Sequence, residues 1–125
     1  MAEQRSEQTV WAAAEERPLS REEYVEKVVH AYRHTPGTTG TVRRPDRLLA
    51  AQWHERGLSL QVIEHALVLA ASRRLMRPPQ APPLNTIRSL AYFTSVIEEV
   101  LASPVSPVYF EYLRNRIQRY LAIGR

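Results

Sequence analysis

The chain has 125 residues, a formal net charge of +4 and 44% hydrophobic residues, a size and composition that suit one domain with one core. It contains no cysteine, which excludes disulfides, thiol catalysis and cysteine-ligated zinc and agrees with a reducing compartment. No stretch approaches the roughly 20 apolar residues of a membrane span, and the N-terminus lacks the pattern of a signal peptide. We therefore expect a cytoplasmic protein with no membrane partner.

The charge is unevenly distributed along the chain. Residues 1–34 carry seven acids and five bases, a net of −2, whereas residues 35–125 carry twelve arginines and six acids, a net of +6. Arginine is well suited to bidentate phosphate contacts, so the basic body favours a polyanionic partner. The alternative interpretation is that a GC-rich genome simply favours arginine codons, and composition alone does not separate the two.

Residues 1–18 are polar and predict a tail or a loose helix, followed by one helical domain over residues 19–125. The first firm helix begins after Ser20, because Ser20 and Glu23 form a capping-box pattern, and apolar residues at helical spacing continue it to about His34. A polar loop with two glycines then spans residues 35–42.

A second helix is predicted from about Pro45 to Gly57, since proline is tolerated in a first helical turn and glycine suits the residue that ends a helix. After a short break, Ser59 can cap a third helix over about residues 60–76. This third helix is apolar on nearly all sides, which is typical of the buried centre of a domain. A proline-rich connector follows, then a fourth helix capped by Asn85 and a fifth that begins at Ser106–Pro107. The sequence therefore predicts an all-α fold, a compact bundle of four to five helices around a buried central helix at about residues 60–76.

The segment around Gly57 has the local chemistry of a helix–turn–helix. In a DNA-reading motif of this kind, the exposed residues of the second helix would be Gln61, Glu64 and His65. Trp53, however, occupies a position where the two helices cross closely, and a short turn between helices is also how any bundle turns a corner. Both interpretations stay open.

Three arginine clusters are the candidate nucleic-acid-binding residues. One precedes and opens the second helix, another ends the third helix, and the last lies on the final helix among tyrosines that can stack on bases. The alternative is that the tyrosines belong to the core and the arginines only solvate the surface. The three clusters are Arg43, Arg44 and Arg47; Arg73, Arg74 and Arg77; and Arg114, Arg116 and Arg119.

Catalytic and metal-binding patterns are weak. Glu26, His30 and His34 share one helical face, but without a fourth ligand a solvated face is the simpler interpretation. The chain has no glycine-rich phosphate loop and no nucleophile elbow. We therefore predict a non-enzymatic protein with no catalytic residues, no metal and no cofactor.

Three phrases of the sequence resemble a known family. They are YVEKVVHAY (Tyr24–Tyr32), GLSLQVIEHA (Gly57–Ala66) and IRSLAYFTSVIEE (Ile87–Glu99). Together they resemble the DnaD-like helical C-terminal modules of replication-initiation proteins from plasmids, phages and integrative elements, in which a helix starts with the pattern of Ile87, Ser89, Tyr92 and Phe93. The resemblance covers about 80 residues and implies DNA association, ahead of RNA, in a bacterial replication or mobile-element setting, together with protein partners. Since no winged-helix domain precedes the module, we expect a stand-alone accessory protein.

Two other classes of function stay open. A small basic helical protein also resembles a structural subunit of a nucleoprotein machine, such as the small helical subunit of a CRISPR effector complex. A third possibility is a protein–protein adaptor that needs no nucleic acid and binds through Trp11, Trp53 or the proline connector.

Overall fold

The computed structural model describes residues 18–123, so the predicted N-terminal tail lies outside the described residues except for Pro18. Within this range the chain forms five α-helices and one short 3-10 helix, η1 (Leu90–Phe93), and it contains no β-strand. None of the described helices is long and apolar enough to cross a membrane. The helices are α2 (Arg21–Arg33), α3 (Arg44–Arg56), α4 (Leu60–Leu75), α5 (Thr94–Ala102) and α6 (Pro107–Ile123).

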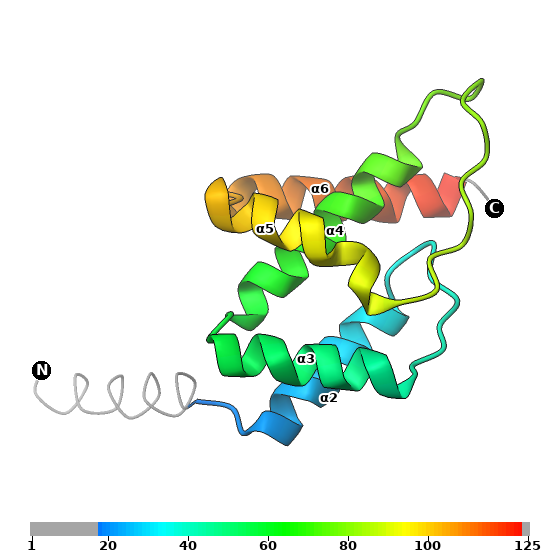
Figure 1. Ribbon diagram of the computed structural model, residues 1–125. Coiled ribbons are helices and arrows are strands. Elements are labelled where there is room, and N and C mark those ends of the chain that lie inside the picture. Colours follow the sequence, from blue (N-terminus) through cyan, green and yellow to red (C-terminus); the bar gives the residue numbers. More distant parts are fainter. Residues whose placement is uncertain (1–17, 124–125) are drawn as a thin grey trace, which may run out of the picture.

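The helices form a compact bundle, which confirms the predicted fold class (Figure 1). α2 and α3 lie against each other on one side, and α5 and α6 lie on the other side of α4. α4 packs on α2, α5 and α6, and residues on most of its sides are buried. It is therefore the central helix that the sequence predicted.

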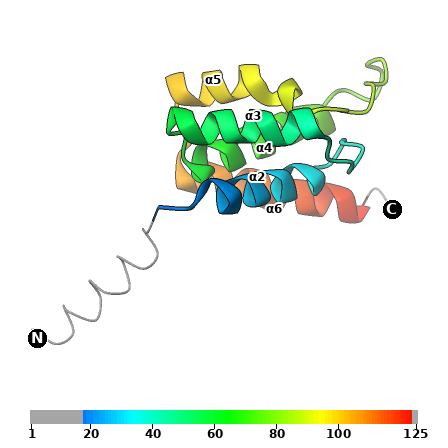
Figure 2. The same cartoon turned by 60° about the horizontal axis from the view of Figure 1, so that its bottom comes forward.

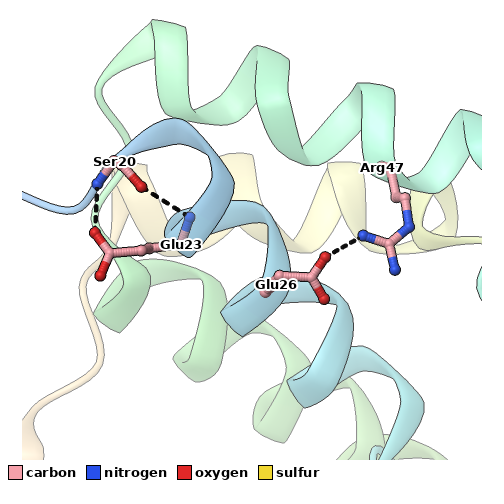
Figure 3. A network of polar contacts seen from close by, with 4 residues as sticks. All are labelled: Ser20, Glu23, Glu26 and Arg47. Atoms are coloured by element: carbon pink, nitrogen blue, oxygen red, sulfur yellow. Dashed lines mark hydrogen bonds and ion pairs between the residues drawn. The ribbon is translucent and has the colours of Figure 1, made fainter.

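Local capping fixes the start of α2 as predicted. The Ser20 side chain accepts a hydrogen bond from the Glu23 backbone N–H (3.1 Å), and the Glu23 carboxylate accepts one from the Ser20 backbone N–H (3.0 Å). Figure 3 shows this reciprocal pair, together with the ion pair between Glu26 on α2 and Arg47 on α3. These contacts satisfy first-turn amides that would otherwise lack a partner.

The turn between α3 and α4 also follows its sequence signals. Gly57 adopts a left-handed conformation with φ of 83°, and the Ser59 hydroxyl accepts a hydrogen bond from the Val62 N–H at 3.2 Å. Beyond the turn, however, α3 packs mainly on α2, whereas α4 packs on α2, α5 and α6. The turn is therefore a corner of the bundle, and the two helices lack the mutual packing of a helix–turn–helix.

The predicted fourth helix is wrong at its start. Asn85 is not a cap, and residues 85–89 are extended up to the beginning of η1. The Ile87 N–H donates to the Gly37 carbonyl (2.8 Å), and the Ile87 carbonyl accepts from the Thr39 N–H (3.0 Å). These hydrogen bonds to a distant loop, with Ile87 only 2% exposed, replace the helical bonds that the local sequence would favour.

The last helix is less buried than its sequence suggests. It begins at Pro107, close to the predicted start, and the Ser106 hydroxyl accepts a hydrogen bond from the Tyr109 N–H at 3.1 Å. Only Leu113 and Ile117 of α6 are buried, whereas Tyr120 and Leu121, which follow Ile117 at helical spacing, are exposed. α6 thus rests on α4 along one narrow stripe.

Candidate nucleic-acid interface

The bundle has two unlike ends (Figures 1 and 2). α2, α4 and α6 end at one of them and α3 begins there, next to the two long connectors, residues 34–43 and 76–89. We call this the loop end. The opposite turn end contains the start of α2 and the two short turns, residues 57–59 and 103–106.

Charge is segregated between these ends. Of the fourteen described cations, ten lie in the connectors or in the half of a helix nearer the loop end. Of the nine described acids, seven lie in the half of a helix nearer the turn end. The ten cations are Arg33, Arg43, Arg44, Arg47, Arg73, Arg74, Arg77, Arg88, Arg116 and Arg119; the seven acids are Glu22, Glu23, Glu26, Glu55, Glu64, Glu99 and Glu111.

Helix dipoles explain only part of this pattern. Cations near the C-termini of α2, α4 and α6 are favoured by the negative end of each dipole. α3 has the opposite direction, and Arg44 and Arg47 lie in its first turn, where the dipole disfavours a cation. The concentration of arginine at the loop end therefore exceeds what helix stability requires.

The first predicted cluster lies at the start of α3. Arg43 and Arg44 are exposed and form no ion pair with a described acid, whereas Arg47 is paired with Glu26 (Figure 3). The buried Asp46 carboxylate positions this cluster, because it accepts hydrogen bonds from the Arg43 N–H (2.8 Å) and from the Leu90 N–H (2.9 Å). Asp46 thereby joins the start of α3 to the start of η1.

The second predicted cluster ends α4, and its arginines differ in their partners. Arg73 makes two hydrogen bonds to Glu99, one of them 2.8 Å long, which raise the pKa of Arg73 and hold the pKa of Glu99 below its ordinary value. Arg74 donates instead to the Asn85 carbonyl (2.8 Å) and to the Tyr92 hydroxyl (3.2 Å). Arg77 donates to the Pro82 carbonyl (3.0 Å). Arg74 and Arg77 thus hold the second connector without losing their net charge.

The two connectors meet at Arg74. Gly37, with φ of 95°, lies directly against the Arg74 side chain, where a Cβ would be 3.1 Å from Nε. The first connector leads from there into Arg43 and Arg44. The structure therefore brings the first two predicted clusters to the same end of the bundle.

The third predicted cluster runs along α6. Arg114 lies 3.8 Å from Glu111, and Arg116 donates to the Tyr112 hydroxyl (2.8 Å). The Tyr112 ring stacks on Tyr109 with centroids 6.0 Å apart, and both rings are about half exposed. Arg119 is exposed and forms no ion pair with a described acid. This cluster thus reaches the loop end through Arg116 and Arg119, in the second half of α6.

Two cations of the loop end were missed in the sequence. Arg33 ends α2 and Arg88 precedes η1, and each is exposed without an ion pair to a described acid. Neither belongs to a local cluster, so only the folded arrangement of the helices brings them near the others.

Other candidate residues do not form a reactive group. His65, expected on an exposed stripe, is buried with its ring 4.3 Å from Phe110, while Gln61 and Glu64 are exposed. The His30 and His34 rings lie 4.3 Å apart, and Glu26, which shares their helical face, is paired with Arg47. Over residues 18–123, no group of three potential ligands is arranged to hold a metal ion.

A groove of about 970 Å³ opens between α2, α4 and α6. Its floor contains Leu67, Val68 and Ala71 of α4, and its walls include Lys27 and Arg33 of α2. Glu26 and Glu64 also line it, so the groove carries charges of both signs.

Comparison with protein-family models, with curated proteins and with solved structures gives no match for this chain.

Proposed function

We propose that the protein is a cytoplasmic, non-enzymatic, DNA-associated accessory protein that contacts the phosphate backbone with its loop end. The observation that carries this proposal is the set of arginines at the loop end that form no ion pair with a described acid. They are Arg33, Arg43, Arg44, Arg74, Arg77, Arg88, Arg116 and Arg119.

The same residue type is used differently at the turn end. There Arg56 makes two hydrogen bonds to Glu98, and Arg21 lies 3.8 Å from Glu55, so each of these arginines has a carboxylate beside it. Arginines grouped without acids repel one another, and this repulsion is relieved when a polyanion binds. Binding would release counterions from the phosphate backbone, which is the main source of sequence-independent affinity for DNA.

Backbone contacts, rather than base reading, fit the arrangement of the helices. A helix that reads bases must present a free face to the major groove. α4, the second helix of the helix–turn–helix-like segment, is covered by α2, α5 and α6. We therefore propose binding with little sequence preference.

The biological setting in the proposal rests on the sequence resemblance. The DnaD-like phrases support a replication or mobile-element role, with DNA ahead of RNA as the partner.

A second candidate is a small structural subunit of a nucleoprotein complex, comparable to a CRISPR small subunit. The observation that favours it is the exposed apolar and aromatic surface of α6, including Val108 and Tyr112, because such surfaces mark sites of protein association. This candidate predicts weak binding to DNA by the protein alone and a defined protein partner on co-purification. An adaptor without nucleic acid predicts no DNA binding at all.

Fluorescence-polarisation titrations with labelled duplex and single-stranded DNA at several salt concentrations test the proposal. With about four phosphate contacts, log K should fall with log salt concentration at a slope of roughly −3 to −4 on duplex DNA. Absence of salt-dependent binding at micromolar protein concentrations would contradict DNA association by the isolated protein.

Two variants of equal net charge locate the surface. Arg43→Gln/Arg44→Gln should weaken binding about tenfold and reduce the salt slope by about 2, since two phosphate contacts are lost. The matched control, Arg21→Gln/Arg56→Gln, removes the same charge at the turn end and should change affinity by less than about twofold. Equal losses in both variants would indicate an effect of net charge alone.

A further inference from the structure

α6 has an outer face that no described element covers. Leu113 and Ile117 are its buried residues, and they face α4. Figure 2 shows α6 along one edge of the bundle. Near its two ends lie the two most exposed large hydrophobic residues of the described chain, Val108 (81% exposed) and Ile123 (84% exposed).

These two residues belong to one stripe. Val108, Tyr112, Arg119 and Ile123 follow at spacings of four, seven and four residues. With 3.6 residues per helical turn, the four side chains fall within a sector of roughly 60°. The centre of that sector lies about 130° around the helix axis from the centre of the two buried residues. The stripe therefore points away from the bundle.

The order of residues in the stripe is symmetric. Its midpoint lies between Asn115 and Arg116, with an aliphatic residue at each end and Tyr112 and Arg119 at equal distances from the centre. An antiparallel copy of α6 related by a two-fold axis at this midpoint would place Val108 opposite the second copy's Ile123. The same operation places Tyr112 opposite the second copy's Arg119, a cation–π pair. A surface that is its own complement under a two-fold rotation is what an isologous dimer requires.

The charge of the two ends favours the same orientation. In an antiparallel pair, the basic loop end of one bundle lies beside the acidic turn end of the other. A parallel pair would bring two basic ends together, and like charges would repel. Charge complementarity and the symmetric stripe thus both indicate that an antiparallel second copy of the protein covers this face.

We propose that α6 is the interface of an antiparallel homodimer formed through Val108, Tyr112, Arg119 and Ile123. The proposal does not require DNA binding. It would cover Arg119 at the interface, whereas the other loop-end arginines of the two copies would lie at opposite ends of the dimer and remain accessible.

The absence of native cysteine allows a direct test by disulfide cross-linking of the full chain. Val108→Cys and Ile123→Cys are made as separate variants and oxidised either alone or as a mixture. Positions 108 and 123 are about 22 Å apart along one helix, far beyond the Cα separation that a disulfide allows. In the antiparallel register, position 108 of one copy instead faces position 123 of the other. The mixture should therefore form a covalent heterodimer at least tenfold faster than either variant forms a homodimer.

The control is Leu48→Cys, an exposed position on α3 (49% exposed), mixed with Val108→Cys. This pair reports the rate of random collision between exposed thiols. A mixture of Val108→Cys and Ile123→Cys that links no faster than the control pair would overturn the proposal. Faster linking of Val108→Cys with itself would overturn the antiparallel register.

Sedimentation equilibrium gives a second readout without thiols. The small interface predicts a dissociation constant of about 10–100 μM for the unmodified protein. Tyr112→Arg should weaken dimerisation at least tenfold, because it places a like charge opposite Arg119 of the second copy. It should not unfold the protein, since Tyr112 is 46% exposed and substitutions at exposed positions usually leave folding intact. An unmodified protein that stays monomeric well above this concentration range contradicts the interface, whatever its affinity for DNA.

Discussion

The two ends of the bundle are held together by different interactions. At the turn end, short turns join the helices, and Arg56 and Glu98 of neighbouring helices form two hydrogen bonds of 2.5 and 2.9 Å. At the loop end, Arg74 and Arg77 donate to backbone carbonyls. An arginine bound to a carboxylate is neutralised, whereas an arginine bound to a carbonyl keeps its full charge. The loop end is therefore ordered and positively charged at the same time.

The arginines of the two ends therefore differ in the charge that they present to solvent. Ion pairs between exposed residues contribute little to stability, so their main effect at the turn end is to neutralise the charge of the arginines. At the loop end the arginines repel one another. The hydrogen bonds of the buried Asp46 carboxylate and the backbone pairing of Ile87 hold the elements of this end together against that repulsion. A partner with negative charge would relieve that repulsion.

Removal of the Asp46 contact, which joins α3 to η1, should lower the free energy of unfolding more than any other change considered below. Asp46→Ala leaves the Arg43 and Leu90 N–H groups without their acceptor, and we expect a loss of about 2–4 kcal/mol in unfolding free energy, measured with urea. Ser59→Ala, a cap at the turn end, should cost only about 1 kcal/mol. Equal losses at both positions would remove the distinction between the ends.

Arg74→Ala should cause the next largest decrease in the free energy of unfolding. It removes the hydrogen bonds to Asn85 and Tyr92, and we expect a loss of about 1–2 kcal/mol. Hydrogen exchange of residues 85–92 should become faster in this variant, because their connection to α4 is lost. Unchanged exchange there would mean that the Ile87 pairing alone orders the connector.

Tyr24→Phe tests a buried tyrosine near the turn end. Burial raises the pKa of Tyr24 from 10.0 to about 12, and its hydroxyl has no hydrogen-bond partner among the described residues. Because the pKa is higher in the folded state, stability that is complete below pH 10 is lost as the pH rises through 12. The variant should match the unmodified protein within about 0.5 kcal/mol at neutral pH. It should also lose less stability in an alkaline titration followed by circular dichroism.

The smallest effect is expected from Glu98→Gln/Glu99→Gln. Hydrogen bonds from Arg56 and Arg73 hold the pKa values of these two carboxylates below the ordinary 4.5. A lowered pKa means that the contribution to stability is present at neutral pH and disappears as the pH falls through the folded-state value. Melting curves of variant and unmodified protein should therefore differ by a few degrees at most near pH 7 and converge once the pH has fallen below the lowered pKa values. A difference that persists in acid would point to a packing effect instead.

The sequence predicts those features of this fold that depend on near neighbours. The caps at Ser20 and Ser59 and the turn at Gly57 need residues within four positions, and each is formed as expected. The central position of α4 follows from its apolar surface. Residues 85–89 could not be predicted, because Ile87 bonds to residues about fifty positions earlier in the chain.

The candidate site was predictable in part for the same reason. The clustering of arginines along the sequence identified Arg43, Arg44, Arg74 and Arg77, which the fold brings to one end of the bundle. It could not show that Arg47 and Arg73 are paired with acids of other helices. Nor could the local sequence identify isolated cations such as Arg33 and Arg88, because only the packing of α2 and η1 in the folded protein brings them to the loop end.

Nuclear magnetic resonance of the isotope-labelled protein, titrated with a short DNA duplex, can locate the binding surface residue by residue. Amide shifts should change at the loop end, in residues 33–44, 74–88 and 116–119, and these changes should diminish with added salt. Amides of residues 21–23, 55–60 and 98–102 at the turn end should stay unchanged. Shift changes centred on the turn end, or none at millimolar DNA, would show that DNA does not bind through the loop end.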